Sequence, residues 1–431
     1  MLEFIYSHTA PASTQNVAPQ PSILSEYIFF PFYDTIVKYY PKCWAPNKVT
    51  LAGVSMTLTS TLLLLSSMPL ETQFSPPRVG LLPASLTSDD SSFSNHTPLS
   101  ISNARPYFSS LTPTSQLILC GFLNLLYCIA DNTDGRLARR DQKTSVIGEY
   151  LDHGLDCVTS LLSTCCVFLV LGCSLSNMAI SVCLIAIATA LSHTLNYEKN
   201  IFIFGNRILS VDEAMVFFGL SMWLPLLFPS LINEQISNGL ASKTCFGFDA
   251  CTSVVSRLKW IEMLYILYNI TQVETFFSLV RRNWQMLFRG HTISIVLNSI
   301  VFLSLVSKHS ADIATDPRSA IPGYVLAPFS YPAIWIITCA CTSSIIVHIP
   351  IAAKCARLSR TNLVPLIGLL FVWIIFTYCP SAGAVLSIVL HVLQVLLILR
   401  LIKARSYLKA KSNKNAHPGT LYTKINGKCH G

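Results

Sequence analysis

The sequence predicts an all-α polytopic membrane protein, with about ten transmembrane helices preceded by an interfacial helix. Of its 431 residues 52% are hydrophobic and only 12% are charged, and the mean hydropathy is +0.52. Soluble globular proteins carry about a quarter charged residues, so an ordinary soluble enzyme and a disordered protein are both excluded. Apolar runs of the length that a helix needs to cross a bilayer also recur along the chain.

Residues 1–45 are expected to form a cytoplasmic N-terminal segment. Residues 1–20 have no basic start followed by an apolar run, so we expect no secretory signal, and the first spanning helix directs targeting. The aromatic-rich stretch from Leu24 to Tyr40 is interpreted as a helix lying on the membrane surface. The alternative is a plain linker.

Residues 46–403 contain ten apolar runs and are expected to form the transmembrane domain. The expected spans are 48–69, 114–133, 152–173, 176–196, 211–233, 260–280, 291–308, 329–353, 361–379 and 382–403. The loop 70–113 is rich in Ser, Pro and Thr, and we expect it to be disordered and lumenal. Asn95 in this loop begins a glycosylation acceptor pattern, and its use is left open.

The distribution of basic residues predicts the orientation. An even number of spans places both termini on one side, which assigns 23 Lys and Arg residues to that side and seven to the other. Because cytoplasmic loops carry the excess of basic residues, both termini are predicted to be cytoplasmic. The net charge of +9 is then explained by topology, and nucleic acid is not an expected partner. The basic tail, 404–431, continues this bias and can contact anionic lipid.

Four carboxylates at the end of the second span and the start of the third predict a functional site. Asp131 and Asp134 are three residues apart, and Asp152 and Asp156 are four apart, so on helices each pair shares one face. Two consecutive antiparallel helices can bring all four to one pocket at the cytoplasmic boundary. Their mutual repulsion requires one or two divalent cations, and oxygen ligands beside a substrate phosphate suit Mg²⁺ or Mn²⁺.

Small residues and an arginine beside these acids predict a ligand that carries phosphate. Gly135 and Ala138, with Gly148 on the next helix, let a bulky ligand approach the backbone. Arg139 supplies a bidentate donor that suits a phosphate. The pattern therefore predicts a metal–diphosphate site. A charged loop without function accounts for Asp141 but not for acids at helical spacing beside apolar spans.

The spacing Asp131-x2-Asp134-Gly135-x2-Ala138-Arg139-x8-Gly148-x3-Asp152-x3-Asp156 resembles the complete signature of the CDP-alcohol phosphotransferases. The resemblance implies a transferase that moves a phospho-alcohol from its CDP carrier to an acceptor and releases CMP. It implies that Asp131, Asp134 and Asp152 bind metal, with Asp156 as a further ligand or as the base. It also implies that the nucleotide is surrounded by Gly135, Ala138, Arg139 and Gly148.

Further residues resemble the eukaryotic choline and ethanolamine phosphotransferases. They are Gly148-Glu149, Asp152-His153-Gly154, and the segment from Trp44 through Asn47 and Thr50 to Gly53. Asn47 is expected to approach the nucleotide, and the alternative is a Pro–Asn helix start. The loop 70–113 is long for this family, and Tyr197 to Gly205 fits its pattern only loosely, which leaves the substrate preference open.

The resemblance implies a membrane enzyme of the endoplasmic reticulum or Golgi. It would use CDP-choline or CDP-ethanolamine and diacylglycerol to make phosphatidylcholine or phosphatidylethanolamine. An ethanolamine-restricted activity is the runner-up, and a homodimer is left open. The rival from another class is an ion transporter that uses the acids as a relay, against which the lack of an internal repeat counts.

Two residues compete to activate the acceptor hydroxyl. A positioned base typically contributes 10²–10⁴-fold, and an unperturbed histidine titrates near pH 6.5. Glu149 lies one turn before His153 and can orient its imidazole, whereas Asp156 shares the metal-facing side with Asp152. We favour a neutral His153 as the base, with Asp156 bound to metal.

The remaining polar residues of the spans receive structural interpretations. Most of the 15 cysteines are expected to be small core residues, as for Cys165, Cys166 and Cys183, although Cys245 and Cys251 can form a lumenal disulfide. Three histidines are interpreted as packed helix residues: His193, His348 and His391. Two acids of the sixth span either line an acceptor chamber or pair with neighbouring helices: Glu262 and Glu274.

Overall fold

The computed structural model describes residues 22–66, 113–173, 175–203, 205, 210–228, 260–315, 331–358 and 365–416. Within these ranges the chain is helical and contains no strand. The predictions for the loop 70–113 with Asn95, for Cys245 and Cys251, and for residues 417–431 lie outside the described residues.

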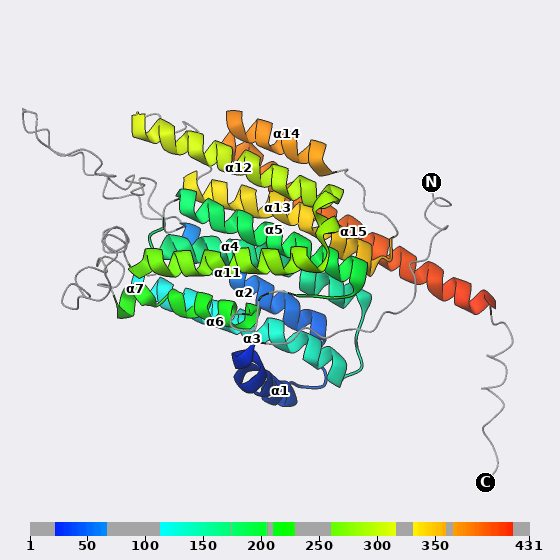
Figure 1. The fold of residues 1–431 in the computed structure, drawn as a ribbon. Coiled ribbons are helices and arrows are strands. Elements are labelled where there is room, and N and C mark those ends of the chain that lie inside the picture. Colours follow the sequence, from blue (N-terminus) through cyan, green and yellow to red (C-terminus); the bar gives the residue numbers. More distant parts are fainter. Residues whose placement is uncertain are drawn as a thin grey trace, which may run out of the picture.

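Figure 1 shows the helices packed side by side in one bundle, with α1 at one side of it. The first half comprises η2 (Ser25–Phe29), α1 (Phe30–Tyr39), α2 (Pro46–Ser66), α3 (Pro113–Arg140), α4 (Val146–Val170), α5 (Leu175–Lys199), α6 (Val211–Ser221) and α7 (Leu224–Leu227). The second half comprises α11 (Trp260–Arg282), η3 (Trp284–Phe288), α12 (Gly290–Thr315), α13 (Tyr331–Cys355), α14 (Pro365–Tyr378) and α15 (Pro380–Ala416).

Seven of these helices are long and apolar enough to cross a membrane: α2, α3, α4, α5, α12, α13 and α15. They confirm the predicted fold class. The other three expected spans also coincide with helices, but α6 has 11 residues, α14 has 14, and α11 carries two acids. That these three cross the membrane remains a prediction. The last expected span, 382–403, continues as helix to Ala416, into the basic tail.

The core of the bundle lies between α4, α5 and α13. The apolar part of α13 is 89% buried, whereas that of α15 is 22% buried, so α13 is central and α15 presents its side chains outward. Small Ala, Ser, Thr and Cys side chains line the central helices, which allows the close approach that helix packing in a membrane requires. Cys165, Cys166 and Cys183 are buried in this core as expected.

The N-terminal helix is two-faced. In α1 the side chains of Tyr33 and Val37 are buried, and α1 packs against α3. Tyr27, Phe32 and Tyr39 are exposed. This division is typical of a helix at a membrane surface, and its placement there remains a prediction.

The two helices of the acid motif extend beyond their expected ends. The helix α3 continues seven residues past position 133, and α4 begins six residues before position 152, so all four acids are helical. The Ser145 hydroxyl accepts a hydrogen bond from the Gly148 N–H at 2.9 Å and caps α4. In the turn before it, Gln142 adopts a φ of 55°.

Candidate active site

The predicted site residues line two adjoining cavities that share Asp152 and His153. The outer cavity, of about 530 Å³, lies among α2, α3, α4 and the turn between α3 and α4. The inner chamber, of about 300 Å³, lies among α3, α4, α5, α6 and α11. All eleven residues that were predicted to be catalytic, nucleotide-binding or metal-binding line one or both of these cavities.

The outer cavity collects the residues expected around a nucleotide. It is lined by Asn47, Asp134, Gly135, Ala138, Arg139, Gly148 and Glu149, besides the two shared residues. The Thr50 hydroxyl donates a hydrogen bond to Asp134 and holds this buried carboxylate against α2. A Cβ at Gly148 would lie 3.0 Å from the Asn47 Oδ1, so the glycine permits α2 to bring Asn47 to the cavity wall.

The inner chamber contains the two remaining acids. The Tyr127 hydroxyl donates a hydrogen bond to Asp156 Oδ1 at 2.9 Å. The carboxyl groups of Asp131 and Asp156 are also within hydrogen-bond reach of each other. Among the described residues, Asp131 Oδ1 is buried without a hydrogen-bond partner. Two adjacent acids and one unpartnered oxygen form a site that needs positive charge.

These residues fit a divalent cation. Ligand atoms of Asp152, His153 and Asp156 lie within 4.8 Å of one another. Hard oxygen donors dominate the set, as magnesium and manganese prefer. The sequence predicted one pocket for all four acids, and the structure divides them: Asp134 faces the outer cavity, Asp131 and Asp156 face the chamber, and Asp152 faces both.

His153 lies among aromatic rings at the junction of the two cavities. Its ring centroid is 5.5 Å from that of His193 and 5.0 Å from that of Phe202. His193 was expected to be only a packed residue, but it also lines the chamber. The other two histidines match the expectation: His348 contacts the Tyr150 hydroxyl at 2.8 Å, and His391 packs against His348.

Lys354 is a neighbour of the site that the sequence did not reveal. Its ammonium lies 3.2 Å from Glu149 Oε1 and donates a hydrogen bond to Asn196 Oδ1 at 2.7 Å. It therefore ties α4, α5 and α13 together beside His153. The predicted topology already explains a single lysine at the end of a span, so no signal in the sequence marked it. That Glu149 orients His153 remains a prediction.

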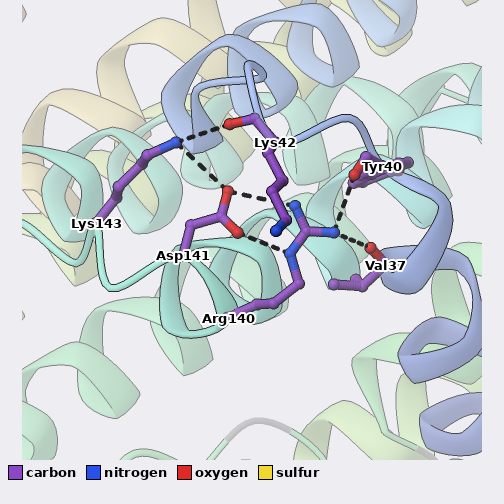
Figure 2. A network of polar contacts seen from close by, with 6 residues as sticks. All are labelled: Val37, Tyr40, Lys42, Arg140, Asp141 and Lys143. Carbon is purple, nitrogen blue, oxygen red and sulfur yellow. Dashed lines mark hydrogen bonds and ion pairs between the residues drawn. The ribbon is translucent and has the colours of Figure 1, made fainter.

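A polar network joins the end of α1 to the turn after α3 (Figure 2). It is formed by Val37, Tyr40, Lys42, Arg140, Asp141 and Lys143. The Arg140 Nε donates a hydrogen bond to Asp141 Oδ1 at 2.7 Å, and this bond lowers the pKa of Asp141. Asp141 lines neither cavity, whereas Lys143 lines the outer one.

The helix α11 supplies neutral groups to the inner chamber. Thr271, Gln272 and Thr275 line it. Glu262 is half-buried and Glu274 is exposed, and neither lines the chamber. Of the two alternatives left open for these acids, lining the chamber is therefore excluded, because the helix turns its threonine and glutamine face inward.

The fold and the site define a polytopic membrane protein with a carboxylate site at the junction of two cavities. Residues 97–229 match the family described as CDP-alcohol phosphatidyltransferase. The resemblance predicted from the motif is therefore confirmed over this segment.

Curated relatives match parts of the chain. The chain is 25% identical to Ethanolaminephosphotransferase 1 of Homo sapiens over 224 residues, which are 49% of each protein. It is 29% identical to Choline/ethanolaminephosphotransferase 2 of Arabidopsis thaliana over 158 residues, 37% of this chain and 28% of the relative. It is 25% identical to Cholinephosphotransferase 1 of Homo sapiens over 145 residues, 34% of this chain and 25% of the relative. The matches thus cover half or less of each relative.

Proposed function

We propose that the protein transfers phosphocholine or phosphoethanolamine from the CDP-alcohol to diacylglycerol, releasing CMP and forming phosphatidylcholine or phosphatidylethanolamine. The observation that carries this proposal is the meeting of two cavities at Asp152 and His153. One of them lies at the helix ends and presents glycine and basic groups. The other lies among membrane helices, where a lipid acceptor can keep its acyl chains in the bilayer.

The outer cavity is suited to the CMP half of the substrate. Arg139 and Lys143 provide cationic donors for the diphosphate. Gly135 and Gly148 leave the backbone accessible, and Asn47 presents an amide to the nucleotide. The relatives named for choline and ethanolamine support a CDP-alcohol of this kind.

The acids at the junction are proposed to hold one or two Mg²⁺ or Mn²⁺ ions. When bound, a divalent cation neutralises the diphosphate and makes the phosphorus more electrophilic. Asp131, Asp134 and Asp152 are its proposed ligands, with Asp156 as a fourth. The unpartnered oxygen of Asp131 and the close approach of Asp131 to Asp156 support this assignment.

His153 is proposed to remove the proton from the acceptor hydroxyl. The diacylglycerol oxygen then forms a bond to the phosphorus that carries the headgroup, and the bond from that phosphorus to the CMP oxygen breaks. The proton stays on His153 until it passes to water or to the leaving phosphate. Asp156 is the alternative base, but the Tyr127 hydroxyl and Asp131 already occupy its carboxylate.

The setting of this activity is also a proposal. We place the protein in the endoplasmic reticulum or Golgi membrane with both termini cytoplasmic, which the excess of basic residues on one side supports. An ethanolamine-restricted activity is the alternative within the family. A homodimer remains compatible with the exposed face of α15.

Purified protein in liposomes tests the proposal directly. With diacylglycerol, Mg²⁺ or Mn²⁺, and either CDP-choline or CDP-ethanolamine, we expect CMP release and formation of the matching phospholipid. Leaving out diacylglycerol or adding a chelator should stop both. Metal or proton flux without CMP release would favour the transporter and contradict the proposal.

A further inference from the structure

The inner chamber contains one acid that does not belong to the motif. Asp212, in the first turn of α6, lines the chamber with an exposed fraction of only 8%. The other acids of its wall are Asp131, Asp152 and Asp156. Among the described acids that line the chamber, Asp212 is therefore the one that has no role in the proposed transfer reaction.

The partners of Asp212 are neutral. The Ser25 hydroxyl donates a hydrogen bond to its Oδ2 at 2.6 Å, and the neutral Asn132 side chain lies nearby. Among the described residues no basic side chain forms an ion pair with it, since nearby Arg136 pairs with Asp34. A carboxylate buried without a counter-charge is costly, so a cation that enters the chamber would compensate for it.

The neighbouring acid, Glu213, makes contacts that are purely structural. Its carboxylate accepts a hydrogen bond from the Ser210 N–H at 2.6 Å and another from the Ser22 hydroxyl. These bonds cap α6 and fasten the N-terminal segment to it. Glu213 does not line the chamber, whereas Asp212 does.

Asp212 lies in the chamber that would receive the cationic headgroup of the proposed substrate. Asn132, which lines the chamber together with Asp212, directly follows Asp131 on α3. If CMP occupies the outer cavity and the diphosphate spans the junction, the headgroup continues into the chamber beside these residues. On the basis of the proposed function, we infer that Asp212 binds the headgroup ammonium and favours a primary ammonium over a quaternary one.

The expected preference for a primary ammonium follows from the kinds of side chain that line the chamber. A primary ammonium has three N–H donors, which a carboxylate can accept, whereas a trimethylammonium has none and is bound best by aromatic faces. Four aromatic residues, besides histidine, line the chamber, and each already contacts another side chain: Tyr127, Phe202, Phe218 and Tyr268. Tyr127 hydrogen-bonds to Asp156 and Thr159, and Tyr268 packs against Phe168 and Phe218. Phe202 packs against His153 and His193, and Phe218 lies six residues after Asp212, about 9 Å further along α6.

A series of CDP-alcohols with zero, one, two and three N-methyl groups tests the inference. Wild type and Asp212→Asn are compared in diacylglycerol liposomes by kcat/KM. We expect the substitution to lower kcat/KM about 10- to 100-fold for CDP-ethanolamine, mainly through KM, because a charge-assisted hydrogen bond is lost. The loss should shrink with each methyl group and fall below about threefold for CDP-choline.

Two controls separate recognition from structure. Glu213→Gln, which changes the adjacent acid, should affect all four substrates by the same factor. Inhibition by CMP, which has no headgroup, should be unchanged in Asp212→Asn, and Asp212→Glu should restore part of the preference. Equal losses for all four substrates, or no loss, would overturn the inference. Absence of CMP release by wild type with every substrate would instead overturn the proposed function.

Discussion

The outer cavity and the inner chamber differ in the kind of group that they present. The outer cavity lies at helix ends and presents glycines, Arg139 and Lys143, whereas the chamber lies between helices and presents neutral hydroxyls, amides and acids. A soluble carrier needs backbone access and positive charge, while a lipid acceptor needs an entry within the bilayer. Under the proposed function, this difference matches the division of the motif acids between the two spaces, with Asp152 in both.

The strongest prediction is that acids from either side are equally essential. Asp134→Ala on the outer side, and Asp131→Ala or Asp152→Ala toward the chamber, should each abolish CMP release while the protein still accumulates in membranes. Each substitution removes an oxygen ligand that apolar neighbours cannot replace. Asp141→Asn is the matched control, since this acid lines neither cavity, and it should retain activity. Near-normal turnover in any of the three alanine variants would remove that residue from the site.

The second prediction concerns the residue shared at the junction. His153→Gln should lower kcat by about 10²–10⁴-fold while binding of metal and CDP-alcohol survives, because only proton transfer is lost. Asp156→Asn should weaken the dependence on metal as well. The measurement is kcat and KM from pH 6 to 9. Full activity of His153→Gln over that range would transfer the role of base to Asp156.

The smallest predicted effect lies within the outer cavity. Asn47→Ala should raise KM for the CDP-alcohol about 3- to 10-fold, as expected for one lost hydrogen bond. Gly148→Ala should have a similar effect, because its Cβ would lie 3.0 Å from Asn47 Oδ1 and displace it. The double variant should then be no worse than Asn47→Ala alone. Effects that multiply would show that Gly148 acts independently of Asn47.

Much of the candidate site follows from local spacing. Acids three and four residues apart share a helix face whatever the rest of the fold does, so the two pairs were predictable from Asp131 to Asp156. The helical extent was underestimated, because charged residues at the membrane boundary end an apolar run without ending the helix. For this reason α3 and α4 are longer than the expected spans.

Groups from distant elements were not predictable in this way. Lys354 and Asp212 reach the site from α13 and α6, and no pattern of functional residues surrounds either of them in the sequence. The direction of Glu262 and Glu274 was likewise left open, since an acid in an apolar run indicates an energetic cost but not which way the side chain points. Which face of a helix looks inward depends on its packing partners, and these are absent from the local sequence.

The sequence by itself determined the fold class, the apolar helices and the pattern of acids, because hydropathy and helical periodicity are local properties of the chain. Only the tertiary structure decided that these acids border two cavities and that Asp152 and His153 lie between them. It also decided that Asp212 faces the chamber while Glu213 turns to Ser22 and Ser210. The physical reason is that a cavity is enclosed by side chains from several helices, whose rotations are set by packing against one another.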